Sequence, residues 1–167
     1  MKEQQSAAVL VLSDKGARGE RQDLCTDIAV RYLKDHGYTI AETRLISDDY
    51  DGIVTNLKEL ADSVGVDLII TSGGTGFSVR DNTPEATEAV ATRKVPGIAE
   101  AMRSFSLQIT DRAMLSRATS VLRNGTLIVN FPGSPKALEE VIEYVLPAIG
   151  HGLEILKGSA QECARPL

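Results

Sequence analysis

The sequence predicts an α/β fold in which helices cover both faces of a mixed, mostly parallel sheet. Short apolar runs of strand length alternate with amphipathic helical segments, as in parallel βαβ units. An Asn124-Gly125 dipeptide separates two later strand-like runs and favours an antiparallel hairpin, because both residues tolerate positive φ. A chain of 167 residues with 43% apolar side chains can close one large core, so we expect a single domain over residues 1–167.

The first half of the chain predicts three strands and two helices. Ala7 to Leu12 is continuously apolar, as in a strand buried on both faces, and leads into a Ser-Asp-Lys-Gly loop. Apolar residues recur at helical spacing from Asp23 to Lys34, and Gly37 is placed to end that helix in the left-handed conformation. The elements expected next are a strand over 38–46, a helix from Ile53 to a stop near Gly65, and a strand over 66–71.

The second half adds the hairpin and further helices. Thr83-Pro84 and Ser134-Pro135 each predict a helix start, with an N-cap hydroxyl before a proline at the first helical position. Hairpin strands are expected over 119–123 and 126–131. Helical periodicity covers 96–107 and also 137–156, where Pro147 and the glycines at 150 and 152 predict interruptions.

Composition excludes several classes of protein. A net charge of −5 argues against nucleic-acid binding, which depends on Lys and Arg neutralising phosphates. The first apolar run is far shorter than the roughly 20 residues that span a bilayer, so we expect a cytoplasmic protein with no membrane partner. Cys25 and Cys163 lie far apart without a CxxC motif, which favours buried or idle thiols over a disulfide or a metal site.

The most informative segment runs from Thr71 to Ala86 and contains Gly73-Gly74-Thr75-Gly76; we call residues 73–82 the glycine loop. It follows a buried strand and precedes a helix, which places it at the carboxyl edge of a parallel sheet, where α/β proteins bind ligands. Successive N–H groups there can hold phosphate oxygens, although a tight turn requiring positive φ is an equally good interpretation. The spacing matches neither a P-loop nor a dinucleotide fingerprint.

Two aspartates are predicted to converge at this edge. Asp48 follows the second strand, and Asp81 ends the glycine loop. Because the carboxyl ends of parallel strands face the same way, both carboxylates can reach one crevice and hold Mg²⁺ together with water and phosphate oxygens. The alternative for each aspartate alone is a solvated loop residue or a cap.

Two further segments reach the same edge. Ser116 and Arg117 offer a hydroxyl and a guanidinium that could grip phosphate, and the turn 130–136 presents a helix N-terminus that favours anions. Ser134 is also explained by a plain N-cap role. Lys15, Arg18 and Arg21 in the first loop are either phosphate ligands or ordinary surface charges.

Five segments in a fixed order cover nearly the whole chain, beginning with Ser13-Asp14-Lys15-Gly16. The other four are Gly73-Gly74-Thr75-Gly76 with Arg80-Asp81-x-Thr83-Pro84-Glu85-Ala86, Pro96-Gly97 with Met102-Arg103, Leu115-Ser116-Arg117-Ala118, and Asn130-x-Pro132-Gly133-Ser134-Pro135-Lys136. Together these segments resemble the MogA/MoaB family of molybdopterin adenylyltransferases and the related G domains of gephyrin-like proteins. One departure is Ala118-Thr119-Ser120, where relatives often carry small residues ending in glycine.

The resemblance implies a three-layer α/β/α sandwich, a homotrimer and Mg²⁺-dependent transfer of AMP from ATP to molybdopterin, with release of pyrophosphate and onward delivery to a molybdenum-insertion protein. It implies that Asp48 and Asp81 are the catalytic and metal-binding residues. The nucleotide- and pterin-binding residues that it implies are Ser13, Gly73, Gly74, Thr75, Gly76, Thr83, Pro84, Glu85, Ser116, Arg117, Pro132, Gly133 and Ser134.

Two other functions are compatible with the same fold, because fold alone does not fix function. A relative of the MoaB branch could bind pterin or nucleotide without turnover, but the presence of both Asp48 and Asp81 favours the enzyme. A scaffolding role like that of gephyrin-type G domains is less favoured, since no linker to a second domain is evident.

Overall fold

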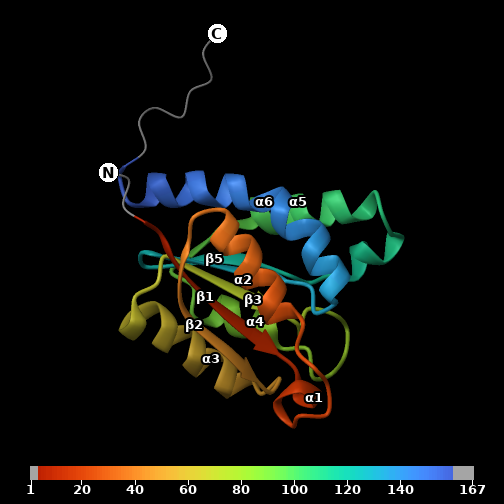
Figure 1. The fold of residues 1–167 in the computed structure, drawn as a ribbon. Coiled ribbons are helices and arrows are strands. Elements are labelled where there is room, and N and C mark those ends of the chain that lie inside the picture. Colours follow the sequence, from red (N-terminus) through yellow and green to blue (C-terminus); the bar gives the residue numbers. More distant parts are fainter. Residues whose placement is uncertain (1–3, 160–167) are drawn as a thin grey trace.

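The computed structural model describes residues 4–159 (Figure 1). Within these residues, six strands form one sheet in the order β2-β1-β3-β6-β5-β4. The strands are β1 (Ser6–Leu12), β2 (Thr39–Ile46), β3 (Leu68–Ser72), β4 (Arg93–Lys94), β5 (Ser120–Arg123) and β6 (Thr126–Phe131). Strands β2, β1, β3 and β6 pair in parallel, whereas β5 and β4 are antiparallel, which confirms the predicted mixed sheet.

Helices pack on both faces of the sheet and complete the α/β/α sandwich (Figure 1). One face carries α2 (Cys25–Asp35), α5 (Pro96–Leu107) and α6 (Pro135–Leu156). The other carries α3 (Tyr50–Lys58), its π-helical continuation η1 (Glu59–Val64), and α4 (Thr83–Ala89). A short helix α1 (Asp14–Ala17) and a 3₁₀ turn η2 (Asp111–Leu115) lie in connecting segments.

Strand β1 shows why its sequence is continuously apolar. Ala7, Val9 and Val11 belong to the core under α2 and α6, whereas the intervening Ala8 and Leu10 belong to the core over α3 and α4. Successive side chains point to opposite faces, and both faces are covered by helices. The predicted two-sided burial of this strand is therefore confirmed. Because β1 lies between β2 and β3, its carboxyl end is flanked by the ends of two parallel strands.

Several predicted turns and caps are confirmed. Gly37 and Gly65 have positive φ where α2 and η1 end, and Asn124 has φ of 51° in the hairpin. Ser134 caps α6 by accepting a hydrogen bond from the Ala137 N–H at 3.4 Å.

The predicted N-cap at Thr83 is wrong. Asn82 precedes α4, and Thr83 is already the first helical residue. Its fully buried hydroxyl donates to the Gly73 carbonyl at 2.8 Å. This hydroxyl therefore ties α4 to the glycine loop instead of capping the helix.

The predicted interruptions of the last helix are also wrong, because α6 runs continuously from Pro135 to Leu156. Pro147 faces solvent, while Val145, Leu146 and Ile149 are buried on either side of it. Burial of this apolar face offsets the hydrogen bond that proline cannot make. The ribbon of α6 bends part-way along its length in Figure 1, as expected of a helix with an internal proline.

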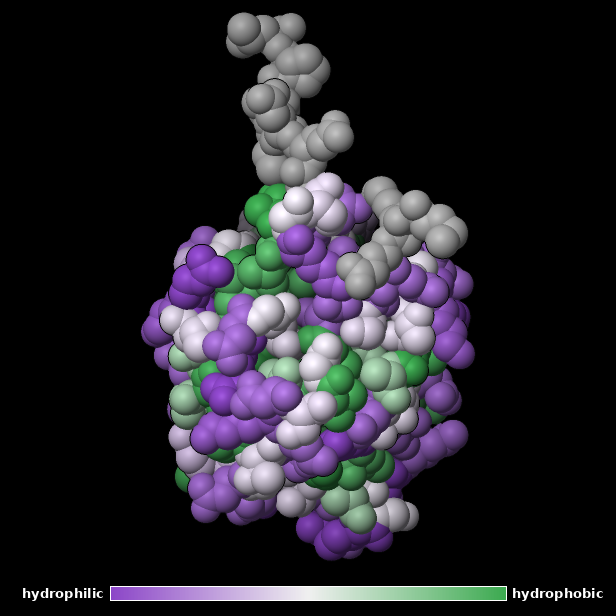
Figure 2. Space-filling model, turned by 90° about the vertical axis from the view of Figure 1, so that its left-hand side faces the viewer, coloured by the Kyte–Doolittle hydropathy of each residue, from purple (hydrophilic) through white to green (hydrophobic). Residues whose placement is uncertain are grey.

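The two ends of the parallel strands differ in character. On the side where the strands begin, polar and apolar residues are interspersed over the surface (Figure 2). The carboxyl ends lead into the glycine loop, α1 and the turn before α6.

No helix within residues 4–159 is long and apolar enough to cross a membrane. Cys163 lies outside the described residues.

Candidate active site at the carboxyl edge of the sheet

The ends of β1, β3 and β6 meet so closely at this edge that no side chain fits between their backbones. A Cβ atom on Gly73, where φ is +108°, would lie 2.3 Å from the Leu12 carbonyl oxygen. A Cβ on Gly133 would lie 3.0 Å from the Gly73 Cα. The Gly73 N–H donates to the Phe131 carbonyl at 3.2 Å. We call this meeting of Leu12, Gly73 and Gly133 the backbone floor; it requires glycine at both glycine positions.

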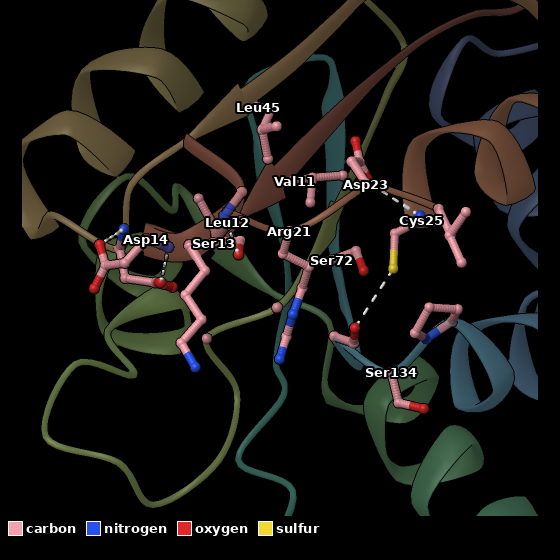
Figure 3. Close-up of a pocket in the computed structure, with 18 of the residues that line it drawn as sticks. Val11, Leu12, Ser13, Asp14, Arg21, Asp23, Cys25, Leu45, Ser72 and Ser134 are labelled. Carbon is pink, nitrogen blue, oxygen red and sulfur yellow. Dashed lines mark hydrogen bonds between the residues drawn. The ribbon is translucent and has the colours of Figure 1, made fainter. Parts of the chain in front are cut away.

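A cavity of about 780 Å³ opens above the backbone floor (Figure 3). Its walls come from the first loop with α1, the end of β2, the glycine loop and the turn before α6. Of the residues predicted to form the site, those that line this cavity are Ser13, Asp48, Gly73, Gly74, Asp81, Gly133 and Ser134. Residues 13, 48, 81 and 134 are thus brought together from four separate parts of the chain.

Asp48 is fixed by a reciprocal pair of hydrogen bonds with Asp14. The Asp14 N–H donates to Asp48 Oδ2 at 3.0 Å, and the Asp48 N–H donates to Asp14 Oδ1 at 3.0 Å. The other oxygen, Asp48 Oδ1, faces the glycine loop, since a Cβ on Gly74 would lie 3.1 Å from it. Burial raises the pKa of Asp48 and outweighs the Asp14 N–H, while the charges of Asp14 and Asp81 add to the rise.

Asp81 is held in a turn at the end of the glycine loop. Its N–H donates to the Ser78 carbonyl at 2.9 Å, and its Oδ2 accepts from the Ser78 N–H at 3.0 Å. Gly76 lies against the same oxygen, because a Cβ there would be 3.0 Å from it. Asp48 and Asp81 therefore line one cavity although 33 positions separate them in sequence.

Asp14 and Arg80 were not among the predicted site residues, yet both line the cavity. Arg80 Nε and Nη2 each donate to the Asp14 carboxylate at 2.9 Å. The hydrogen bond from Arg80 is the main reason that the pKa of Asp14 falls to about 2. Both residues lie inside the motifs of the resemblance, but only the fold shows that they pair across the cavity.

Besides Arg80, two further cationic side chains line the cavity. Lys15 and Arg21 line it, and neither makes an ion pair with another residue of the range 4–159. The Arg21 side chain extends between the walls that carry Asp14 and Ser134 (Figure 3). Arg18 pairs instead with Glu20 at 2.8 Å and does not line the cavity.

Cys25 lines the opposite end of the cavity, beside Leu24 and Pro135. Its thiol donates to the Gly133 carbonyl at 3.4 Å (Figure 3). Burial raises the pKa of Cys25, so the protonated thiol predominates at neutral pH. Cys25 is free and buried, which confirms the burial that the sequence predicts for it.

Comparisons of the sequence and of the fold with known proteins point to the same family. Residues 8–151 match the family described as probable molybdopterin binding domain. The chain belongs to this family. It is 37% identical over 153 residues to the molybdopterin adenylyltransferase of Helicobacter pylori strain ATCC 700392 / 26695, covering 90% of this chain and 87% of the relative. It is 42% identical over 142 residues to the molybdopterin adenylyltransferase of Escherichia coli K12, covering 84% and 73%.

Solved structures of the molybdopterin-binding family superpose over nearly the whole chain. The molybdopterin biosynthesis enzyme MoaB of Thermus thermophilus has a TM-score of 0.87 at 43% identity, covering 94% of this chain and 99% of that one. The molybdopterin biosynthesis Mog protein of Mycobacterium ulcerans has a TM-score of 0.85 at 34% identity, with the same coverage. The predicted MogA/MoaB resemblance is therefore confirmed.

The remaining predicted site residues of this molybdopterin-binding domain are not among the residues that line the cavity. They are Thr75, Gly76, Thr83, Pro84, Glu85, Ser116, Arg117 and Pro132. Arg117 supports the glycine loop from behind: its guanidinium donates to the Gly76 and Asp81 carbonyls at 2.7 Å and pairs with Glu85. Ser116 accepts the Ala118 N–H at 3.3 Å, and the Pro132 carbonyl accepts the Ser72 hydroxyl at 2.9 Å. Arg117 and Pro132 therefore hold the glycine loop and the turn before α6 in place.

Proposed function

We propose that this protein transfers AMP from ATP to molybdopterin in molybdenum cofactor assembly. The observation that carries the proposal is the meeting of Asp48 and Asp81 over a glycine-lined cavity of about 780 Å³. The family match and the names of the curated relatives support the same reaction. In that reaction a terminal phosphate oxygen of molybdopterin forms a bond to the α-phosphorus of ATP, the bond from that phosphorus to the bridging oxygen breaks, and pyrophosphate leaves.

The acidic groups of the cavity fit a magnesium ion. Asp48 and Asp81 bring negative charge to one partly buried place, which a divalent cation would balance, whereas the charge of Asp14 is already balanced by Arg80. Among residues 4–159, no group of three or more His, Cys, Asp or Glu side chains is arranged to hold a metal by itself. One or two carboxylates are sufficient for Mg²⁺ when substrate phosphates and water complete its shell. When bound, the ion neutralises charge on the triphosphate.

The remaining walls suit phosphates and their positioning. The cations Lys15 and Arg21 can neutralise phosphate oxygens, and the Gly74 N–H at the cavity wall can serve as a neutral donor. Phosphoryl-type transfer depends mainly on in-line placement and charge balance, with little covalent chemistry for the protein. The geometry therefore supports a role in which the chain holds both substrates and excludes misaligned poses.

The proposed reaction is tested by following pyrophosphate release from ATP when purified protein meets molybdopterin, with and without Mg²⁺. We expect release only when all three are present. Asp81→Asn should abolish AMP transfer, because the neutral amide no longer shares a cation with Asp48, while the unfolding temperature changes little for this partly exposed side chain. Undiminished product formation by Asp81→Asn would refute the assignment of the metal site.

The second candidate is a protein that binds pterin or nucleotide without turnover. The same assay separates the two: a binder would retain ATP, measured by calorimetry, without releasing pyrophosphate. The paired carboxylates favour the enzyme, since binding alone does not need a metal-holding pair.

We also propose that the protein is a cytoplasmic homotrimer that delivers its product to a molybdenum-insertion protein. Exposed apolar side chains at the end of α5 and along η2 support an interface with further copies; they are Leu107, Ile109, Met114 and Leu115. A patch of this kind is commonly covered by a partner. Sedimentation velocity should give three times the mass of the 17.9 kDa chain, and a monomer would exclude the trimer.

A further inference from the structure

Asp14 is a third carboxylate at the cavity, with a bonding pattern unlike that of Asp48 or Asp81. It is the first residue of α1, directly after the N-cap Ser13. Its Oδ1 accepts from the Asp48 N–H at 3.0 Å and from Arg80 Nη2 at 2.9 Å, and its Oδ2 accepts from Arg80 Nε at 2.9 Å. Both oxygens are therefore engaged by protein donors, in the two-pronged geometry that is typical of strong Arg–carboxylate pairs.

One side of this network orients Asp48. The Asp14 N–H holds Asp48 Oδ2 at 3.0 Å, which leaves Oδ1 directed toward Gly74 (Figure 3 draws the hydrogen bonds beside Asp14 as dashed lines). The reciprocal bond from the Asp48 N–H fixes the backbone that carries this side chain. The loop after β2 and the start of α1 are thereby held as one unit.

The other side of the network holds the glycine loop. Arg80 is the neighbour of Asp81 in sequence, and its grip on Asp14 draws that end of the loop against α1. The Asn82 amide adds a weaker tie at 3.4 Å to the Asp48 carbonyl. Asp14 is thus bonded directly to Asp48 and, through Arg80, to the segment that carries Asp81.

We propose that Asp14 is a positioning residue that sets the spacing between the Asp48 and Asp81 carboxylates for a divalent cation bound with a nucleoside triphosphate. This inference rests on the proposed function, since it assigns the cation to those two aspartates. A direct ligand role for Asp14 is disfavoured because Arg80 already balances its charge and both of its oxygens accept hydrogen bonds from protein donors. Outer-shell partners of this kind typically change metal affinity or activity by roughly 10- to 100-fold when removed.

The test measures Mn²⁺ binding by electron paramagnetic resonance, in the presence of ATP, for the full-length protein and its variants. We expect Asp14→Ala to weaken Mn²⁺ binding by about 10- to 100-fold. Asp14→Asn should have a smaller effect, because the amide oxygen still accepts from the Asp48 N–H. Glu20→Gln is the matched control: it breaks an exposed Arg–carboxylate pair of the same loop that does not reach the cavity, and should leave binding unchanged.

A double variant separates positioning from an independent role of Arg80. If Arg80 acts through Asp14, Asp14→Ala with Arg80→Gln should bind Mn²⁺ no worse than Asp14→Ala alone. Additive losses would overturn the proposal, as would wild-type affinity in Asp14→Ala. Equal and complete loss in Asp14→Asn and Asp48→Asn would overturn it in favour of a direct ligand. Unfolding midpoints measured in parallel exclude a general loss of structure.

The Mn²⁺-binding test of Asp14 can be judged separately from the proposed AMP transfer. Wild-type protein that binds Mn²⁺ with ATP but releases no pyrophosphate with molybdopterin contradicts AMP transfer, while the variants still decide the role of Asp14. Wild-type protein that binds no Mn²⁺, even with ATP, overturns both.

Discussion

Gly73 occupies the point where the ends of β1, β3 and β6 come closest together. Its φ of +108° lies in a region that other residues rarely adopt, and a Cβ there would lie 2.3 Å from a backbone oxygen that cannot rotate away. Thr83, the first residue of α4, holds the same residue through its hydrogen bond to the Gly73 carbonyl. A single atom added at this position therefore disturbs a strand, a helix and the cavity together.

Gly73→Ala should lower the free energy of unfolding by about 3 kcal/mol, because left-handed strain and a backbone clash add. Gly97→Ala is the control, since a Cβ at that helical position meets nothing within 4 Å and alanine favours helix. Urea titration of both variants measures the difference. Equal stability of Gly73→Ala and the wild type would mean that the backbone floor is not close-packed.

At the scale of single residues, topology is what made the site predictable. Asp48 and Asp81 could be placed together because each follows a parallel strand, and such ends share an edge. The roles of Thr83 and Arg117 could not be predicted, since their partners are carbonyls whose directions depend on the path of the glycine loop. Asp14 and Arg80 lie 66 positions apart, and no periodicity connects them.

Among the elements, the start of β1 is tied to the end of α6 through Asp67. Its carboxylate accepts from the Ser6 N–H at 2.7 Å and pairs with Lys157 at 2.9 Å. Burial opposes ionisation of Asp67, but the Ser6 N–H, Lys157 and the Ser6 hydroxyl outweigh it and lower the pKa. A carboxyl group with a lowered pKa in the folded state stabilises the fold above its unfolded pKa, near 3.9, and loses that contribution as the pH falls.

Asp67→Asn should therefore cost about 1–3 kcal/mol at pH 7, and the cost should shrink as the pH drops below about 4, because the wild-type carboxyl also becomes neutral. Thermal unfolding of both proteins across pH 2.5 to 7 measures the gap. Asp35→Asn, at an exposed position near the end of α2, serves as control and should show little change at either pH. A gap that is constant with pH would exclude an electrostatic origin.

Helix α6 contains a proline that the helix tolerates but does not need. Pro147 is exposed, so replacement with alanine disturbs no buried contact and restores an N–H to the helix. Pro147→Ala should raise the free energy of unfolding by roughly 2 kcal/mol, the helix gain less the added freedom of the unfolded chain. Destabilisation in a urea titration would instead show that the bend is required for packing.

Elements with a clear hydrophobic or turn signal could be predicted from the sequence. Long periodic segments predicted α2 and α5, the latter with the bounds Pro96–Leu107, and short apolar runs predicted β3 and β5. Strand β4, helix α1 and turn η2 are short and lack a repeating hydrophobic pattern, so they could not be predicted. The continuity of α6 was missed because burial of its apolar face, a tertiary effect, overrides the local preferences of Pro147 and the glycines beyond it.

The whole molecule is organised by one sheet shared between two cores. Phe131 and Leu138 belong to the core under α2 and α6, while Ile128 and Leu57 belong to the opposite one. Neither core can lose its helices without exposing a face of the same strands. We propose on this basis that residues 1–167 form a single domain, as expected from the length of the chain.

Calorimetry at fixed protein concentration should therefore show one unfolding transition, with equal calorimetric and van't Hoff enthalpies per cooperative unit. Two resolved transitions would contradict the single domain and would indicate that one helical layer melts first. The general fold could be predicted because the alternation of strands and helices constrains topology, whereas the antiparallel edge at β4 depends on pairing with β5 that the local sequence does not specify.

The lining of the cavity has two components, main chain at the backbone floor and side chains around it. Its base consists of main chain at glycines and a strand end, and offers the same peptide dipoles whatever side chains surround it. Preference for one substrate over another must then come from exposed side chains of the lining, such as Arg21 and Leu24, which can be exchanged without moving the backbone floor. Engineering of altered nucleotide or pterin selectivity should begin at those two positions and leave Gly73 and Gly133 unchanged.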